Sequence, residues 1–554
     1  MVKVSVVVPV YNPGKYFQAC IESLLGQTLP AAELELIFVD DGSTDETPAL
    51  LDTLATEHPQ VQVIHQENSG WPGQPRNVGI AAAQGEYIFF CDHDDWMARG
   101  ALERLYNFAV SCHSDVVLPR MAGIGRPVPY HVFRETRPIC SLADAPIMDS
   151  LTPHKLFRRA FLDAHDLRFP EGKRRLEDHL FVSTAYLLAE VISIYADYTC
   201  YFHLKLEDAS NAGFRRIEWP GYFANLTEAL DGVEARVEPG ELRDRIFRRW
   251  LQVEMVGRLS GGRRVRMGDA EAEALLAAAQ PVAERYFGDG VVSLLPPLSR
   301  AVARAIIAGD GEEILRIATA VAAWRVEPRL LQVGWSAGRL QIAGTAELTD
   351  TDTGESRLTG AELTGSPPAA TPADPEQQVL DHSPTDLSRE YRLARLVGSV
   401  DDESRPTFGL DLTDRRTGAR WFVPATVHQV GLHAAFTADV DPRILAAGRR
   451  LPNGLWDVYL SMAVLGLYDR RRLTLVPERQ PGGVLPEPVE EGLPTWAAYF
   501  TAQTSALALD IGLRKHKELR QPPPEPEPEV VTVAPDPPSL TRRGVRKLRR
   551  IISG

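Results

Sequence analysis

The stretch FFCDHDDW, residues Phe89 to Trp96, decides how the N-terminal part of this chain folds. With the two residues before it, it opens as an apolar run long enough for a buried strand. The run ends in three carboxylates within four residues: Asp92, Asp94 and Asp95. Like charges this close repel, so they lie either in a solvated turn or around a divalent cation. Oxygen ligands suit a hard ion such as Mg²⁺ or Mn²⁺, which commonly also binds substrate phosphates.

Predicted strands and helices alternate through the first 215 residues. The predicted strands are runs of β-branched and aliphatic residues, at 4–10, 34–39, 61–65 and 87–91. Such alternation predicts right-handed β-α-β units and a parallel sheet, in which ligands bind at the carboxyl ends of strands. The segments Pro9–Tyr11, Asp40–Asp41 and Asp92–Asp95 all fall at such ends, so we expect one binding site there.

Composition narrows the class of protein. A chain of 554 residues is too long for one core and predicts two to four domains. The net charge of −14 argues against nucleic acid as a partner. The N-terminal residues predict a first strand and no signal peptide, and no apolar run reaches the roughly 18 residues needed to span a bilayer. The 5 cysteines are scattered without a Cys-x-x-Cys pair, which predicts reduced thiols in the cytoplasm and no zinc site.

The later part of the chain changes period twice. Residues 216–328 keep helical spacing and predict a helical linker domain. Residues 329–480 alternate apolar with other residues between Gly, Asp and Pro turns, which predicts a β-sandwich, roughly Ig-like. The alternating positions of Trp335, Trp421 and Trp456 predict burial, and the alternative is a sugar-binding platform.

The last segments differ from all others in composition. Residues 481–538 are proline-rich and acidic, which predicts an extended linker. In the tail 539–554, 6 basic residues fall within 542–550, and apolar residues recur at helical spacing. This pattern predicts a short helix that lies on anionic lipid. The alternatives are a disordered basic tail and one that binds the acidic body of the same chain.

Four motifs in order resemble one family. VVVPVYN, VDDGSTD, FFCDHDDW and LEDHLF (176–181) resemble the family-2 inverting glycosyltransferases with the nucleotide-sugar-binding GT-A fold, over residues 1–215. The loop NSGWPGQPRN (68–77), the segment GIGRPVP (123–129) and the later domains are similar to the enzymes that add β-linked sugars to the polyribitol phosphate of wall teichoic acid.

The resemblance implies a uridine nucleotide site. Pro9, Tyr11 and Asp41 are expected to line the uracil pocket, with Tyr11 stacking on the base and Asp41 accepting from it. Asn68 and Arg76 would complete the site. The alternatives are that Tyr11 is a packing aromatic at a strand end and that Arg76 forms a salt bridge with an acidic neighbour.

The resemblance also implies a metal site. Asp92 would hold the ribose, Asp94 the metal, and Asp95 would position the loop. Members of the family often have a further ligand, a histidine past the last core strand, which the teichoic acid enzymes carry about where Ala209 stands here. His203 is the nearest histidine and the expected ligand, although its register is equally that of a strand residue.

Asp178 in LEDHLF is the expected general base, and Glu177 would orient the donor sugar or the acceptor. A helix is predicted to begin here, and its dipole would keep Asp178 ionised. The alternative is a pair of ordinary first-turn acids. Arg126 is the candidate for binding an acceptor phosphate, and the basic cluster 173–175 either assists it or is a solvated loop.

Together these inferences predict a metal-dependent inverting glycosyltransferase that moves a sugar from a UDP-sugar to a phosphate-rich, teichoic-acid-like polymer at the inner face of the cell membrane. One alternative is a capsular or exopolysaccharide glycosyltransferase. Another is a non-catalytic scaffold that binds sugar nucleotides or polymer. The related enzymes trimerise through C-terminal β-domains, so a homo-oligomer is expected from the resemblance.

Overall fold

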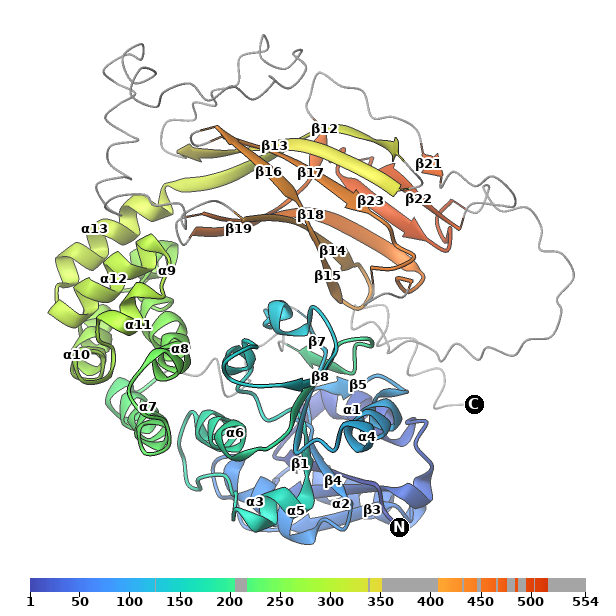
Figure 1. Ribbon diagram of the computed structural model, residues 1–554. Coiled ribbons are helices and arrows are strands. Elements are labelled where there is room, and N and C mark those ends of the chain that lie inside the picture. Colours follow the sequence, from blue (N-terminus) through green and yellow to red (C-terminus); the bar gives the residue numbers. More distant parts are fainter. Residues whose placement is uncertain are drawn as a thin grey trace, which may run out of the picture.

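The structure, a computed structural model, describes residues 1–124, 126–204, 217–336, 339–350, 407–430, 433–445, 450–464, 467–475, 484–486, 495–502 and 504–516. Figure 1 shows three parts: an N-terminal α/β domain, a group of helices beside it, and a pair of β-sheets that lies over the α/β domain. The third part is joined to the first through the helices.

The N-terminal domain is built on a mixed sheet. Its strands are β1 Val4–Val10, β2 Leu34–Asp40, β3 Val61–His65, β4 Tyr87–Phe90, β6 Val116–Pro119, β8 Arg137–Cys140, β9 Leu156–Arg158 and β10 Ile192–Tyr195. They stand in the order β3-β2-β1-β4-β9-β6-β10-β8. The flanking helices are η1 Gly14–Tyr16, α1 Phe17–Leu25, η2 Ala31–Glu33, α2 Thr47–Glu57, α3 Gly73–Ala82, α4 Ala101–Cys112, η3 Tyr130–Phe133, η4 Ile147–Asp149, α5 Arg159–Ala164 and α6 Glu177–Leu188.

The expected parallel pairing is confirmed for the strands predicted from sequence, and the complete sheet is mixed. Strands β1 to β4 pair in parallel, as the alternation of strands and helices requires, but β9 is antiparallel to both β4 and β6. Strand β8 is also antiparallel to its neighbour β10. A parallel pair needs a crossover connection, and the chain reaches the three-residue strand β9 through a loop and η4 without a long helix.

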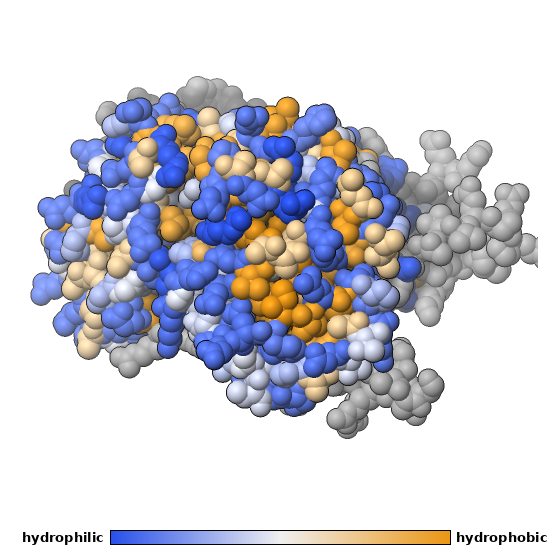
Figure 2. Space-filling model, turned by 90° about the horizontal axis from the view of Figure 1, so that it is seen from below, coloured by the Kyte–Doolittle hydropathy of each residue, from blue (hydrophilic) through white to orange (hydrophobic). Residues whose placement is uncertain are grey.

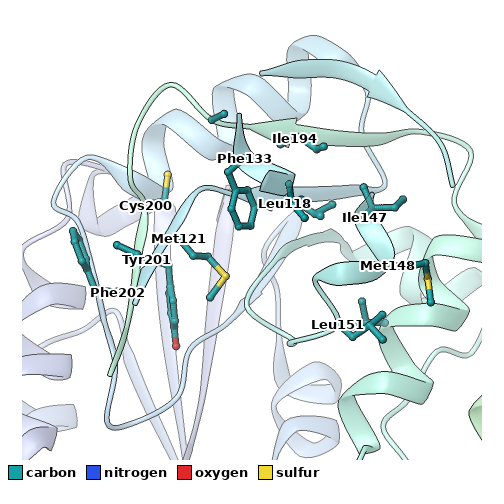
Figure 3. Packing of buried hydrophobic residues seen from close by; sticks show 14 of the residues in the cluster. Leu118, Met121, Phe133, Ile147, Met148, Leu151, Ile194, Cys200, Tyr201 and Phe202 are labelled. Atoms are coloured by element: carbon teal, nitrogen blue, oxygen red, sulfur yellow. The ribbon is translucent and has the colours of Figure 1, made fainter. Parts of the chain in front are cut away.

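A second, three-stranded sheet lies next to the acidic loop. It consists of β5 Trp96–Met97, β11 Tyr201–Leu204 and β7 Met121–Ile124, in that order. Figure 3 shows Met121, Tyr201 and Phe202 from this sheet in the same hydrophobic cluster as Leu118 and Phe133. The small sheet is therefore anchored in the core and holds its residues at fixed positions beside the acidic loop.

Helix α3 packs unusually close to the main sheet. A side-chain carbon at Gly79 would overlap Val7 of β1, so only glycine fits at this position. The close approach fixes the start of α3, where Arg76 lies, against the carboxyl ends of the central strands.

The helical domain spans α7 to α13. Its elements are α7 Trp219–Glu234, α8 Glu241–Trp250, the π-helical turn η6 Leu251–Val256, α9 Gly261–Arg266, α10 Asp269–Tyr286, α11 Asp289–Ser293, α12 Pro297–Ala308 and α13 Gly311–Ala322. It contacts helix α6 through a buried hydrogen bond in which Trp250 Nε1 donates to His179 Nδ1 at 3.1 Å. The change to β structure comes at Trp324, slightly before the position expected from periodicity.

The C-terminal β-rich domain has two sheets. Their strands are β12 Trp324–Ser336, β13 Arg339–Asp350, β14 Thr407–Asp414, β15 Arg420–Pro424, β16 Thr426–Val430, β17 His433–Val440, β18 Gly454–Val464, β19 Leu467–Arg472, β20 Thr474–Leu475, β21 Leu485–Pro486, β22 Trp496–Phe500 and β23 Leu507–Ile511. One sheet has the order β16-β17-β13-β12-β20, and the other β15-β14-β18-β23-β22-β21 with β19 beside β18. The prediction of a β-sandwich is confirmed.

The tryptophans of this domain have different surroundings. Trp456 is completely buried and Trp421 nearly so, as predicted. Trp335 is half-buried and contacts Trp496 of the opposite sheet edge-on, with ring centroids 4.8 Å apart. Trp421 faces the N-terminal domain and takes part in the contact between the two domains, described below.

The helices and the surface of the described residues bear on the question of a membrane span. None of the helices in the described part of the chain is long and apolar enough to cross a bilayer. Seen from the side of the N-terminal domain, hydrophobic residues gather in one area of the surface among hydrophilic ones (Figure 2). The basic tail 539–554 lies outside the described residues. The prediction of an extended linker over 481–538 is wrong for its first part, because β21, β22 and β23 pair there in the second sheet; the rest of that segment, from residue 517, lies outside the described residues.

Candidate active site

The residues expected around the nucleotide base lie at the ends of β1 and β2. Pro9 is buried in β1, and Tyr11 just after the strand is 43% exposed, which argues against the alternative of a packed aromatic. Asn12 ties this strand end to the loop after β2: its Nδ2 donates to Thr44 Oγ1 at 3.3 Å, and its Oδ1 accepts from the Thr44 amide at 2.9 Å. The strand end that carries Tyr11 is therefore held beside the loop that begins at Asp41.

The buried carboxylate of Asp41 orders the loop after β3. It accepts from the Ser69 amide at 3.0 Å, from Ser69 Oγ at 2.9 Å and from Gln66 Nε2 at 2.6 Å. Asn68 is held nearby, because its Nδ2 donates to the Asp41 carbonyl at 2.8 Å. A carboxylate offers about four lone-pair directions, so Asp41 can accept one further hydrogen bond from a ligand.

Arg76 joins the two acidic motifs. Its Nη2 donates to Asp92 Oδ1 at 2.8 Å and its Nη1 to Glu177 Oε1 at 3.1 Å. Only 3% of Arg76 is exposed, and its guanidinium also lies 5.2 Å from the centre of the Phe169 ring. Trp71 Nε1 donates to the other Glu177 oxygen at 2.7 Å. The salt bridge considered as an alternative for Arg76 is thus present. Through it, Asp92 and Glu177, the acids expected at the donor and the acceptor, both bind the same guanidinium.

The three acids of FFCDHDDW have different surroundings. Asp92 is half-buried and also lies 3.5 Å from Nε2 of the buried His154. Asp95 is fully buried and accepts from Tyr201 Oη at 2.6 Å and from the Leu204 amide at 2.7 Å. Asp95 therefore fastens the acidic loop to β11, the positioning role expected of it.

Two groups of residues could each hold a metal ion, and they share Asp95. Within each group the ligand atoms lie within 4.8 Å of one another: one group is Asp92, Asp94 and Asp95, and the other is Asp95, His154 and His203. Burial lowers the pKa of His154 to about 4 and that of His203 well below its ordinary value, so both imidazoles are neutral, the form that binds metals. Burial raises the pKa of Asp94. Burial, followed by the charge of Asp94, also raises the pKa of Asp95 well above its ordinary value. The donor atoms fit Mn²⁺ or Mg²⁺.

The structure places the expected metal ligands around a shared neighbour. His203 is buried on β11, with Nε2 3.8 Å from Asp95 Oδ2, and Asp94 belongs to the other group. His203 is thus a strand residue and also a possible ligand. Ala209, where the related enzymes carry their histidine, lies outside the described residues.

Asp178 stands in the first turn of α6, a helix that follows directly on an unusual backbone position. Leu176 has φ +62°, a left-handed conformation that is costly for a non-glycine residue and concentrates at functional sites. Burial, followed by the charge of Glu177, raises the pKa of Asp178 to about 7, against the opposing charge of Arg76. The expectation that the helix dipole keeps Asp178 ionised is therefore wrong in direction, because desolvation outweighs it. A carboxylate with this pKa can both accept and release a proton near neutral pH.

The basic residues expected at the acceptor differ in position. The charge of Arg126 lowers the pKa of both Asp94 and His203, so its guanidinium lies near these candidate metal ligands. In the cluster 173–175, Arg174 pairs with Glu228 of α7 at 2.8 Å, and Arg175 lies 5.9 Å from the centre of the Trp71 ring. At least one member of that cluster thus joins domains.

Sequence reasoning missed two residues of the site. His154 stacks on Tyr201 with ring centroids 4.4 Å apart, but its segment shows no periodicity or motif that could have revealed it. Lys155 is completely buried, and burial lowers its pKa to about 7 while the charge of Asp178 opposes the shift. Lys155 directly precedes strand β9, and its burial became visible only in the fold, where buried lysines are rare.

The fold and this site define a GT-A nucleotide-sugar-binding domain. Residues 5–175 match the family Glycosyl transferase family 2, and residues 220–318 match the Glycosyl transferase TarS linker domain. The chain belongs to glycosyltransferase family 2, and its helical domain is a linker of the TarS type.

Three similar proteins refine this placement. The chain is 38% identical over 235 residues to the poly(ribitol-phosphate) beta-glucosyltransferase of Bacillus spizizenii, covering 42% of this chain and 37% of that protein. It is 30% identical over 239 residues to the poly(ribitol-phosphate) beta-N-acetylglucosaminyltransferase TarP of Staphylococcus aureus, covering 42% of this chain and 72% of TarP. The crystal structure of S. aureus TarS 1–349 in complex with UDP-GlcNAc matches with a TM-score of 0.51 and 27% identity, covering 61% of this chain and 96% of that one. The matched part thus spans little more than a third of the first relative.

Proposed function

We propose that this protein transfers a hexose or N-acetylhexosamine from a UDP-sugar to a phosphate-rich cell-envelope polymer, with inversion at the anomeric carbon. The observation that carries the proposal is the buried guanidinium of Arg76, which bonds both Asp92 and Glu177. This contact supports a site in which the donor and the acceptor meet between the two acidic motifs.

The donor would enter over the ends of β1 and β2. Tyr11 offers an exposed ring to the base, and Asp41 has one lone-pair direction left for a base N–H. Asn68 would add a polar contact to the nucleotide, and Asp92 would accept from the ribose. The likeness to a TarS fragment that binds UDP-GlcNAc supports a UDP-sugar as the donor.

Asp178 would be the general base. It takes the proton from an acceptor hydroxyl while that oxygen forms a bond to the anomeric carbon. The bond between the anomeric carbon and the diphosphate oxygen breaks, and UDP leaves with the electron pair. Glu177, held by Arg76 and Trp71, would orient the sugar for this in-line attack. A divalent cation held by Asp94 and His203 would supply charge neutralisation for the leaving diphosphate.

The polyribitol phosphate relatives support a teichoic-acid-like acceptor. Arg126, which lies near the candidate metal ligands, would bind an acceptor phosphate. The β-rich domain, which contributes none of the residues proposed above for catalysis or donor binding, would serve to assemble subunits, a trimer by resemblance to the related enzymes.

The basic tail would hold the protein at the inner face of the cell membrane, in the cytoplasm. Six cations and a row of apolar residues in 541–554 support this proposal from sequence alone. Removing residues 539–554 should release the protein from anionic vesicles, and equal vesicle binding by both forms would refute the proposal.

One experiment separates the candidate functions. The full chain is incubated with Mn²⁺, UDP-glucose or UDP-GlcNAc, and either poly(ribitol phosphate) or a neutral polysaccharide, and UDP release and polymer-bound sugar are measured. The proposal predicts UDP release that depends on poly(ribitol phosphate). Transfer to the neutral polymer alone would favour a capsular or exopolysaccharide enzyme. No UDP release with either donor or acceptor would favour a scaffold.

A further inference from the structure

A cavity of about 630 Å³ lies where the β-rich domain meets the N-terminal domain. One wall comes from the segment 127–134, between β7 and β8, and the other from β15. The turn between β14 and β15 touches β7, since a side-chain carbon at Gly418 would lie 3.0 Å from the Gly123 carbonyl oxygen. The two domains are thus in direct contact at the edge of the cavity.

Arg120 is the unusual residue in this cavity. Only 4% of it is exposed, and Nη1 donates to the Phe133 carbonyl at 2.8 Å while Nη2 donates to the Arg420 carbonyl. Its guanidinium also lies on the face of Trp421. Among the described residues, no carboxylate lies within ion-pair distance of Arg120. Burial consequently lowers the pKa of Arg120 to about 9. A buried cation without a counter-charge is costly, and an anionic ligand would offset that cost.

The rest of the lining keeps this excess of positive charge. Arg134 is exposed at the cavity, lies 5.0 Å from the centre of the Phe422 ring, and also has no carboxylate partner in the described part of the chain. The acid of the lining, Asp411, is engaged by Arg420. Two arginines, Arg120 and Arg134, therefore remain for an external anion.

Aromatic faces accompany these cations. Tyr130, Trp421 and Phe422 line the same cavity. Guanidinium groups bind phosphate, and aromatic rings pack against the C–H faces of sugars and polyols. A sugar phosphate or polyol phosphate unit matches both features, because its phosphate suits the arginines and its C–H groups suit the aromatic lining.

The cavity is connected to the candidate active site through β7. Arg120 immediately precedes this strand, and Gly123 within it stands opposite His203 of β11. The segment after β7 carries Arg126 beside the active site and then Pro127 and Val128 in the cavity wall. The same segment thus borders both the candidate active site and the cavity.

We propose that the cavity binds a phosphodiester-linked polyol unit of the acceptor polymer, a unit other than the one that receives the sugar. This inference rests on the proposed function for the identity of the polymer. It assigns to the β-rich domain a share in acceptor binding, since β15 supplies one wall.

The test measures binding of a ribitol phosphate oligomer of defined length to the full chain by calorimetry, in the absence of donor. Arg134→Ala should weaken binding about tenfold, which corresponds to about 1.4 kcal/mol, and Arg134→Lys should restore part of it. Arg120→Gln should weaken binding at least as much. Arg266→Ala removes an exposed arginine of the linker domain and should bind like wild type. Affinity for UDP should be unchanged in all variants.

The outcomes distinguish this inference from the proposed function. If Arg134→Ala and Arg120→Gln bind the oligomer as Arg266→Ala does, the cavity is not an acceptor site, even if wild type transfers sugar. If Arg120→Gln does not fold, Arg134→Ala, whose side chain is exposed, still decides. If wild type transfers no sugar but its binding depends on Arg134, the proposed function fails and the binding site stands.

Discussion

Arg76 on helix α3 and Glu177 at the start of α6, 101 positions apart in sequence, form a buried ion pair with Nη1 and Oε1 3.1 Å apart. Because the same guanidinium bonds Asp92, the spacing between the acidic loop and the first turn of α6 is fixed by one side chain. Asp178 is the next residue after Glu177, so this ion pair also fixes the position of Asp178.

Replacing Arg76 with glutamine should therefore affect both stability and chemistry. Asp92 and Glu177 would lose their shared cation, and breaking a buried pair costs about 3–5 kcal/mol of unfolding free energy. The apparent pKa of Asp178 should rise further, because the charge of Arg76 lowers it. Urea unfolding and the pH dependence of kcat measure the two effects.

The control for this variant is Arg168→Gln, which breaks an exposed pair with Asp163. Exposed pairs contribute about 0–1 kcal/mol, so the control should stay close to wild type. Equal stability of the two variants, with an unchanged pH profile for Arg76→Gln, would show that the buried pair does not organise the site.

The linker domain should stabilise α6 through Trp250. Trp250→Phe removes the hydrogen bond to His179 and leaves a buried nitrogen without a partner, a loss of about 1–3 kcal/mol. Trp96→Phe is the matched control, because the indole nitrogen of this buried tryptophan has no hydrogen-bond partner among the described residues. If chemical denaturation shows equal losses for both variants, the contact with His179 contributes nothing measurable.

Divalent metal should bind and stabilise the protein through the predicted ligands. At a concentration about 100 times its Kd, Mn²⁺ should add about 2.7 kcal/mol to the stability of wild type. Asp94→Asn and His203→Ala should lose most of that gain, while Asp163→Asn, an exposed carboxylate outside the site, should keep it. Thermal unfolding with Mn²⁺ or a chelator measures the gain. A full gain in both site variants would remove these two residues from the metal site.

The β-rich domain should determine oligomeric state. Light scattering should find more than one chain per particle for the full protein and a single chain for a form that ends after α13, at residue 322. The reason is that the removed part contains strands β12 to β23, whereas the residues proposed for catalysis and donor binding lie in the N-terminal domain. A monomeric full-length protein would contradict this prediction.

The strand ends and the acidic motifs could be predicted from the local sequence pattern, because each of them depends on residues that are neighbours along the chain. Val4–Val10 and Leu34–Asp40 form as buried strands where their apolar runs stop, and Asp92 to Asp95 follow the next one. The antiparallel insertion of β9 could not be predicted, since three residues carry no periodic signal.

The missed parts of the site depend on tertiary burial. His154 joins Asp92 and Asp95 only because β9 inserts beside β4. The sequence predicts a low pKa for Asp178, because the start of a helix can be recognised from sequence. The pKa is raised instead, because burial in the folded chain, which sequence does not reveal, has the larger effect. Arg120 likewise shows nothing unusual in sequence, because only the folded structure reveals that no described carboxylate lies within ion-pair distance of it.

The central claim is that Asp178 is the general base, and the pH dependence of kcat for wild type and Asp178→Asn tests it most directly. The base works when deprotonated, so wild-type kcat should rise about tenfold per pH unit below pH 7 and level off above, as its pKa of about 7 requires. Asp178→Asn should lower kcat by about 10²–10⁴-fold, lose this rise, and bind UDP as wild type does. Turnover of Asp178→Asn within a few-fold of wild type, with the same rise through pH 7, would contradict the account.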